Sequence, residues 1–170
     1  MAKSGQLPET ALNKISELYD RWGEALYHYA LTLTKFDKDA EEVVQNLFLI
    51  VARKWRRISR VKDVKNYLYR ATRNQALNFI SRQRFAQKAR KEIEKNSLVH
   101  PEKNDPRRKA EAERLNQLLA ELPREQREII VLKIYQGFTF SEISRILKIP
   151  ANTCASRYRY GLAKLREKLL

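Results

Sequence analysis

The 170-residue chain carries 35 Lys and Arg against 20 Asp and Glu, a formal net charge of +15 that favours nucleic acid as partner, with an anionic membrane surface second. The single Cys154 excludes an internal disulfide and a multi-cysteine metal site, and without an apolar run of ~18 residues or a signal-peptide core we expect a cytoplasmic protein. Four Gly, five Pro and no alternating apolar pattern predict an all-α chain with room for one ordinary domain or two small ones.

The first predicted helix spans residues 9 to 35, where apolar and aromatic residues recur at helical spacing. We expect its core positions to be Ile15, Leu18, Tyr19, Trp22, Leu26, Tyr29, Ala30 and Leu33. Phe36-Asp-Lys-Asp39 then breaks the pattern, and Asp37 or Asp39 is suited to capping the next helix.

The second predicted helix, residues 40 to 55, has an apolar face and an opposite face that is acidic and amide-rich. The opposite face carries Glu42, Gln45, Asn46 and Leu49, at positions i, i+3, i+4 and i+7. In a basic protein this surface does not suit DNA, so we expect it to dock a basic protein partner with Leu49 as the apolar anchor. These residues alone would fit an ordinary exposed helix face equally well.

A basic block follows, in which residues 53 to 91 hold fourteen Lys and Arg against one acid, Asp63. A short connection, residues 56 to 65, leads into a predicted helix over 66 to 84 with two faces. One face packs through Leu68, Thr72, Ala76 and Phe79, and the other presents Tyr67, Arg70, Asn74, Asn78 and Ser81. A run of charge is often only a solvated face, but interleaved Arg, Asn and Tyr side chains suit phosphates and exposed bases.

Residues 96 to 108 contain Pro101 and Pro106 without apolar periodicity, and we interpret them as a linker between domains at 9–95 and 109–170. The second domain should begin with a helix over 109 to 121. Pro123 suits the first turn of a helix from Arg124 to Gln136, with Gly137 as its C-terminal cap. The apolar positions of that helix are Ile129, Ile130, Leu132, Ile134 and Tyr135.

The C-terminal segment predicts a helix-turn-helix. Thr139-Phe-Ser-Glu142 matches a capping box before a short helix, Ile149-Pro-Ala-Asn152 is the turn, and a longer helix starts near Thr153. Its inward positions are Cys154, Tyr158, Gly161, Leu162 and Leu165, so Cys154 is expected to be a buried small residue rather than a redox-sensing thiol. On the outward side we expect base contacts from Thr153, Ser156, Arg159 and Tyr160 and phosphate contacts from Arg157 and Lys164.

Segments from both halves, taken in order, resemble bacterial RNA polymerase sigma factors of the extracytoplasmic-function (ECF) group of the sigma-70 family. They are Asp39-Ala-Glu-Glu-Val-Val-Gln-Asn-Leu-Phe-Leu49, Tyr67-Leu-Tyr-Arg-Ala-Thr-Arg-Asn74, Leu122-Pro-Arg-Glu-Gln-Arg-Glu-Ile129, Gly137-Phe-Thr-Phe-Ser-Glu-Ile143 and Thr153-Cys-Ala-Ser-Arg157. The resemblance implies two helical domains, sigma region 2 and sigma region 4, joined by a flexible linker. Such a protein selects promoters and nucleates their opening, without catalytic residues, metal or cofactor.

The same resemblance implies a partner for each surface. Glu41, Glu42, Gln45, Asn46 and Leu49 would dock the clamp helices of the polymerase β′ subunit, and the β flap would be a second polymerase contact. The opened promoter strand would meet Tyr67, Arg70, Arg73, Asn74 and Asn78, with phosphate contacts from Arg56, Arg57, Arg60 and Lys62, while the last helix reads an upstream element as duplex. An anti-sigma factor is an expected partner from the family alone.

The alternative is an autonomous helix-turn-helix regulator that dimerises, whereas a sigma factor is expected to be a monomer when free. A dimeric regulator would leave the acidic-amide face and the Tyr/Asn stripe unexplained. An enzyme is disfavoured because the sequence has no carboxylate pair, metal-spaced His/Cys set, phosphate loop or nucleophile motif.

Overall fold

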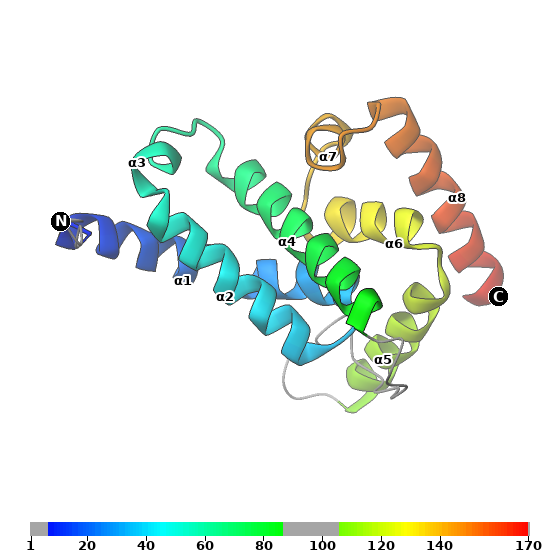
Figure 1. Ribbon diagram of the computed structural model, residues 1–170. Coiled ribbons are helices and arrows are strands. Elements are labelled where there is room, and N and C mark those ends of the chain that lie inside the picture. Colours follow the sequence, from blue (N-terminus) through cyan, green and yellow to red (C-terminus); the bar gives the residue numbers. More distant parts are fainter. Residues whose placement is uncertain (1–6, 87–105, 170) are drawn as a thin grey trace.

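The computed structural model describes residues 7–86 and 106–169, and every regular element in these ranges is helical (Figure 1). The helices are α1 (Glu9–Thr34), α2 (Asp37–Arg53), α3 (Trp55–Ile58), α4 (Val64–Ala86), α5 (Pro106–Glu121), α6 (Arg124–Ile130), the π-helical turn η2 (Val131–Tyr135), α7 (Phe140–Leu147) and α8 (Ala151–Leu169). The all-α prediction is confirmed.

The N-terminal bundle consists of α1, α2 and α4, which pack against one another, with α3 as a single turn between α2 and α4. Each long helix contributes apolar residues from one side, because positions three and four apart lie on the same face of a helix. Leu26, Leu47, Leu68 and Ala76 have no exposed surface. Most polar residues of α2 and α4 are therefore turned to the outside of the bundle, apart from the buried Asn66 and Thr72.

The C-terminal bundle consists of α5 to α8, with α8 packed against both α6 and α7. Gly161 allows α8 to approach α6 closely, since a Cβ atom at this position would lie 2.7 Å from Ile130 Cδ1. The rings of Phe140 and Tyr158 meet edge to face at 5.5 Å and join α7 to α8. This packing fixes the angle between the two helices of the helix-turn-helix.

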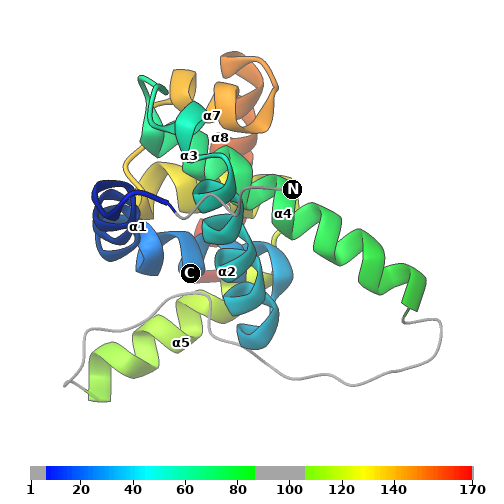
Figure 2. The ribbon, with the colours of Figure 1, turned by 60° about the vertical axis from the view of Figure 1, so that its left-hand side comes forward.

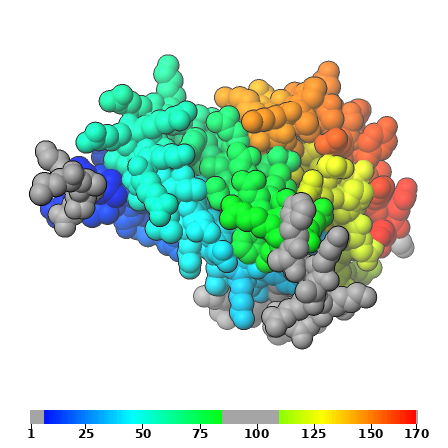
Figure 3. All heavy atoms as spheres, viewed as in Figure 1, coloured from blue at the N-terminus to red at the C-terminus, as the bar shows by residue number. Residues whose placement is uncertain are grey.

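The two bundles share one hydrophobic core, with α4 against α7 and α1 against α6. Tyr29, Tyr69 and Phe138 are almost completely buried at the junction, and their ring centroids lie 5.4 Å and 4.8 Å apart in succession. Figure 3 shows α2 and α4 side by side on one face, with α7 next to α4. The turned view shows the C-terminal half of α4 projecting beyond the other helices (Figure 2). The sequence did not predict that the bundles pack together.

The expected aspartate cap of the second helix is wrong. The helix begins at Asp37 after Phe36, which makes no side-chain cap, so both aspartates lie inside the first turn. Asp37 instead accepts a hydrogen bond from the Tyr27 hydroxyl at 2.6 Å, and Asp39 accepts one from Gln83 Nε2 at 3.2 Å. Their charges still lie near the positive end of the helix dipole.

Several predicted apolar positions are exposed. Tyr19, expected in the core, is 53% exposed, and Ile134 and Tyr135 are 52% and 41% exposed. The last two lie in η2, where the amide of Gln136 reaches back five residues to the Val131 carbonyl at 3.2 Å. A π-helical turn is wider than an α-helical one, so the apolar stripe of α6 stays buried through Val131 and Leu132 but does not continue into the core at Ile134 and Tyr135.

Some predicted boundaries also moved. Residues 56–58 of the basic connection belong to α3, and α5 begins at Pro106, so residues 106–108 of the predicted linker are helical. Residues 96–105 of that linker lie outside the described residues. The last helix begins at Ala151, two residues early, and Tyr158 and Leu162 on it are half-buried rather than buried.

Candidate partner-binding and nucleic-acid surfaces

The predicted docking residues form one outward surface on α2. Leu49 is 53% exposed, and Glu41, Glu42 and Gln45 are exposed, while Asn46 is half-buried at the margin. They are presented because the opposite side of α2 is committed to the core through Val43, Leu47 and Val51. An exposed leucine surrounded by acids and an amide can bind an apolar pocket within a basic partner.

Tyr19 extends this surface onto α1. Its ring meets the Phe48 ring edge to face, with the centroids 5.0 Å apart, and Phe48 follows Gln45 by three residues on α2. A Cβ at Gly23 would lie 3.4 Å from the Tyr19 ring, so the glycine leaves room for the ring on α1 itself. The sequence analysis placed Tyr19 in the core, and the only local signal against that was Gly23 four residues later.

The predicted polar stripe of α4 lies on the surface. Arg70, Asn74, Asn78 and Ser81 are exposed, and Tyr67 is half-buried. They face outward because Leu68, Thr72 and Ala76 are fully buried on the other side. Asp63 caps the helix by accepting the amide of Asn66 at 3.0 Å. The amides of Asn74 and Asn78 are thus held one helical turn apart with donors and acceptors free to meet base edges.

Arg73 was predicted, like Arg70, to contact the opened promoter strand, but its side chain is bonded inside the protein. Its Nε donates to Glu128 Oε1 at 2.9 Å, and the Glu128 carboxylate is 2% exposed. The Tyr29 hydroxyl donates to the same oxygen at 2.7 Å. Burial, together with the Glu128 charge, raises the pKa of Tyr29 well above its usual value, so this hydroxyl remains a donor. Sequence reasoning missed Glu128 because its partners lie far away along the chain.

The basic connection supplies an exposed group of cations. Arg56, Arg57, Arg60 and Lys62 are all exposed, on α3 and the turn that follows it. Ile58 is 1% exposed and anchors this segment to the N-terminal bundle. The four side chains therefore stand near the N-terminal end of α4, where they can reach a polyanion that passes along its stripe.

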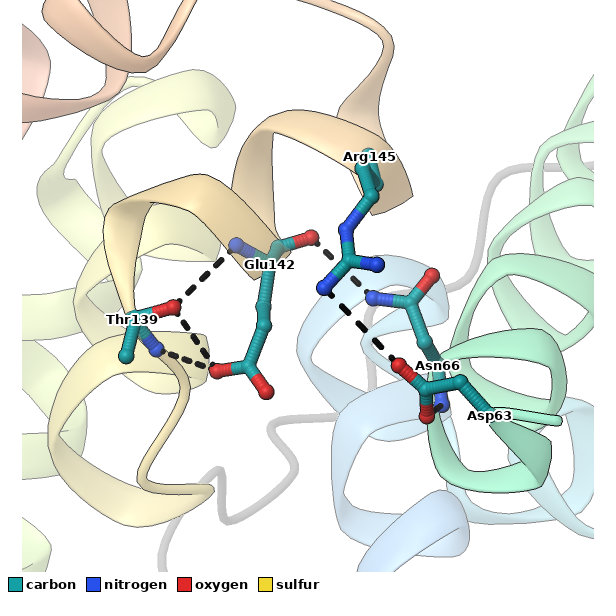
Figure 4. A network of polar contacts seen from close by, with 5 residues as sticks. All are labelled: Asp63, Asn66, Thr139, Glu142 and Arg145. Atoms are coloured by element: carbon teal, nitrogen blue, oxygen red, sulfur yellow. Dashed lines mark hydrogen bonds and ion pairs between the residues drawn. The ribbon is translucent and has the colours of Figure 1, made fainter.

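The helix-turn-helix is built as predicted. The Thr139 hydroxyl accepts the Glu142 amide at 3.2 Å, and the Thr139 amide donates to Glu142 Oε2 at 2.7 Å, which completes a capping box (Figure 4). The Thr139 hydroxyl also donates to Glu142 Oε2 at 2.9 Å, and the two hydrogen bonds that the Thr139 amide and hydroxyl donate to this carboxylate lower the pKa of Glu142. At the turn, Lys148 adopts φ 55°, and the Ser144 hydroxyl donates to the Ile149 carbonyl at 2.6 Å.

The outward side of α8 carries the predicted DNA-reading residues. Arg159 and Lys164 are exposed and Tyr160 is 67% exposed, whereas Thr153, Ser156 and Arg157 are half-buried. The Ser156 hydroxyl donates to the Asn152 carbonyl at 2.8 Å, which leaves its lone pairs for a base edge. Cys154 has no exposed surface, and burial raises the pKa of its thiol, as expected of a buried apolar residue.

Two searches of the described residues bear on other kinds of site. Within residues 7–86 and 106–169, no group of three or more His, Cys, Asp or Glu side chains could hold a metal ion. None of the helices in these ranges is both long and apolar enough to cross a membrane.

Comparison with known proteins gives the family. The Sigma-70 region 2 family matches residues 18–86, and the Sigma-70 region 4 family matches residues 112–165. The chain is 30% identical over 156 residues to the ECF RNA polymerase sigma factor SigL of Mycobacterium tuberculosis, an alignment that covers 88% of this chain and 85% of SigL.

Solved structures share the fold. The sigma factor RpoE in complex with the anti-sigma factor NepR from Bartonella quintana has a TM-score of 0.75 and 22% identity, covering 92% of this chain and 96% of RpoE. CnrH in complex with the cytosolic domain of CnrY has a TM-score of 0.65 and 20% identity, covering 93% of this chain and 88% of CnrH.

These matches run through both halves of the chain in the order that the sequence motifs predicted. They also remove the reason to consider an autonomous regulator, because such a protein would have no use for region 2. The chain belongs to the ECF group of sigma-70 RNA polymerase sigma factors, non-catalytic subunits that direct transcription initiation.

Proposed function

We propose that the three surfaces divide the work of initiation between polymerase, opened promoter strand and upstream duplex. The observation that carries the proposal is the separation of chemistry by helix: an acidic surface with exposed Leu49 on α2, and exposed Asn74 and Asn78 within the basic block on α4. An acidic surface repels DNA and suits a protein, whereas amides among cations suit nucleic acid. On this proposal residues 9–95 dock on core polymerase and melt the promoter, residues 96–108 link the two domains, and residues 109–170 read the upstream element.

The α2 surface is proposed to dock the clamp helices of the β′ subunit, with Leu49 and Tyr19 as apolar anchors. Leu49→Asp should weaken binding of core polymerase by about 2 kcal/mol or more without unfolding the bundle, because it places a charge at the anchor. Leu169→Asp is the matched control, since Leu169 is also 53% exposed but lies at the far end of α8. Core binding at wild-type strength by Leu49→Asp, measured by titration with labelled protein, would contradict the docking surface.

The α4 surface is proposed to stabilise the opened promoter strand. Losing a few kcal/mol of stacking and pairing per opened step must be offset by capture of unpaired bases and by phosphate contacts. Asn74→Ala and Asn78→Ala should impair strand opening, read as permanganate reactivity of promoter thymines, while core binding is unchanged. Asn13→Ala, an exposed asparagine on α1, is the control. Unchanged thymine reactivity in both α4 variants would reject this assignment.

The phosphate contacts are proposed to come from both bundles. Arg70 and the exposed cations of the connection, Arg56, Arg57, Arg60 and Lys62, would hold the opened region, and Arg157 and Lys164 the upstream duplex. Tyr67 is placed to stack on an unpaired base. Arg73 joins this group only when its hydrogen bond to Glu128 is broken.

Two further partners are proposed from the family. The β flap is expected to meet the C-terminal bundle, where Ile134 and Tyr135 are exposed apolar side chains suited to a protein contact. An anti-sigma factor is also expected, and the structural relative RpoE, solved in complex with the anti-sigma factor NepR, supports this. The free protein is expected to be a monomer.

A further inference from the structure

The early start of α8 adds a residue to its outward side. The sequence pattern assigned Asn152 to the turn before the helix, but α8 begins at Ala151, so Asn152 lies in its first turn. Residues spaced by three or four positions share one face of a helix. One outward face of α8 therefore carries the reading stripe, which consists of Asn152, Ser156, Arg159 and Ala163. Ser156 is half-buried, and the other three residues are exposed.

The opposite side of α8 is committed to packing. The helix contacts α5, α6 and α7, and Cys154, Gly161 and Leu165 are buried on that side. Figure 1 shows α8 at the edge of the molecule, next to α6 and α7. The reading stripe is therefore open to a partner along its length, and the short side chain of Ala163 would not hold a DNA duplex away from it.

The polar groups of the reading stripe differ in what they can donate and accept. Within residues 7–86 and 106–169, the Asn152 side-chain amide and the Arg159 guanidinium have no hydrogen-bond partner, so both are available to a ligand. The Ser156 hydroxyl donates its only proton to the backbone carbonyl of Asn152 at 2.8 Å, so towards DNA it can only accept. The stripe thus presents an amide, then an acceptor, then a fork of donors.

Each of these groups matches one kind of base edge in the major groove. An asparagine amide pairs with adenine through N6 and N7, and an arginine fork pairs with guanine through O6 and N7. A hydroxyl that only accepts requires an exocyclic amine, which adenine and cytosine present in the major groove and guanine and thymine do not. A recognition helix brings its N-terminal residues to the base edges, which is where Asn152 lies on α8.

We propose that Asn152 is a base-reading residue and that the upstream element places an adenine opposite it, two or three base-pair steps from a guanine opposite Arg159. A base opposite Ser156, between the two, carries an exocyclic amine. The proposal rests on the function proposed above, in which α8 reads the upstream duplex. The spacing follows because residues 152 and 159 lie about 10 Å apart along the helix axis and base pairs are about 3.4 Å apart, while side chains about one turn apart contact successive base pairs in DNA-reading helices.

Selection of promoters by the holoenzyme tests the proposal. Core polymerase with the wild-type protein is bound to a library of randomised promoters, and the bound molecules are sequenced. The wild type should enrich adenine at one upstream position and guanine two or three steps away. Asn152→Ala should lose only the adenine preference, whereas Asn152→Asp should shift it towards cytosine, because a carboxylate accepts from N4 of cytosine. An unchanged adenine preference in Asn152→Ala would overturn the proposal.

An altered base in the selected promoter gives a second test. An adenine analogue with carbon in place of N7 cannot accept from the Asn152 amide, so it should weaken upstream binding of the wild-type holoenzyme by about fivefold or more. The same analogue should have no effect on Asn152→Ala, because the partner of N7 is already absent. Lys164→Ala is the control, since it should weaken binding to both duplexes and keep the effect of the analogue. Equal losses in the wild type and in Asn152→Ala would overturn the proposal.

Failure of the function proposed above would look different. The wild-type holoenzyme would then show no base preference anywhere in the upstream region. Failure of this inference alone leaves that preference in place, with Arg159→Ala still relaxing one position and Asn152→Ala relaxing none.

Discussion

Gly161 is the residue on which the close packing of α8 against α6 depends. A Cβ here would lie 2.7 Å from Ile130 Cδ1 and 3.2 Å from Gln126 Cβ, and Ile130 is 1% exposed. The buried side chain of Ile130 has little room to move, and Gln126 Cβ is fixed by its own backbone. The steric cost of a methyl group should therefore exceed the helix propensity that alanine adds.

Gly161→Ala is expected to destabilise the protein by about 1 kcal/mol, measured by urea unfolding. Ile130→Val removes the Cδ1 methyl and should relieve the clash, so in that background Gly161→Ala should cost less or become stabilising. Additive effects of the two changes would show that the close approach does not limit stability.

At residue scale the proposed functional side chains are held in place by their neighbours. Tyr19 rests against Phe48 and over Gly23, and Arg73 is bonded to a buried glutamate. Local sequence indicates the type of side chain at each site but not its neighbours. Whether Tyr19 is core or surface depends on how α1 lies against α2.

At the scale of elements, α7 is short and depends on its caps. Isolated helices of this length are unstable in water, so the Thr139–Glu142 capping box and burial of Ile143, Ile146 and Leu147 must stabilise it. Because α7 fixes the start of α8 through the turn at Lys148, a weaker cap on α7 also weakens the support for α8, the proposed DNA-reading helix.

Thr139→Ala should cost about 1 kcal/mol and lower the melting temperature by about 2–4 °C. The lowered pKa of Glu142 means that its contribution is present above its unfolded pKa near 4.5 and is lost as the pH falls through the lower folded value. Glu142→Gln keeps an acceptor for the Thr139 amide but does not titrate, so part of the acid sensitivity should disappear in thermal unfolding at pH values from about 6 to 3. An unchanged pH profile would contradict a stabilising role for the carboxylate.

At the scale of the whole molecule, charge is sorted by surface. The basic block supplies most of the net charge of +15, and the part that the structure describes, residues 53–86, lies mainly on α3, α4 and the turn between them, while the exposed side of α2 is acidic and amide-rich. Like charge keeps DNA away from the docking surface, and unlike charge draws it to α4 and α8. On the proposed assignment, one small protein can thus bind a larger enzyme and a polyanion at separate surfaces.

Variants of residues that read bases and variants of residues that hold phosphates should differ in how their DNA binding depends on sequence and on salt. Arg159→Ala should cost about 1–3 kcal/mol at one base position and relax preference there, because a guanidinium fork contacts base edges directly. Lys164→Ala should weaken binding equally on all sequences and reduce the slope against salt by about one. Equal losses on matched and mismatched duplexes for both variants would contradict the division.

Much of the fold followed from sequence because helices depend on neighbours three and four residues apart. Periodicity located each long helix described by the structure, the capping box was correct, and the outward faces of α2, α4 and α8 carry nearly all the predicted residues. Errors came where a local pattern had two solutions, as at Asp37, which bonds Tyr27 rather than capping α2, and at Ile134, which a π-helical turn exposes.

The sequence by itself determined the all-helical character, the chemistry of the three surfaces and the resemblance to sigma factors, since these are properties of residue order. Only the tertiary structure decided that the two bundles share a core and that Glu128 binds Arg73 and Tyr29. Those contacts join residues 55 and 99 positions apart, and no periodicity along one helix specifies which face of another helix will meet it. The burial of a charge is decided by the packing of helices, so it could not be predicted from one helix alone.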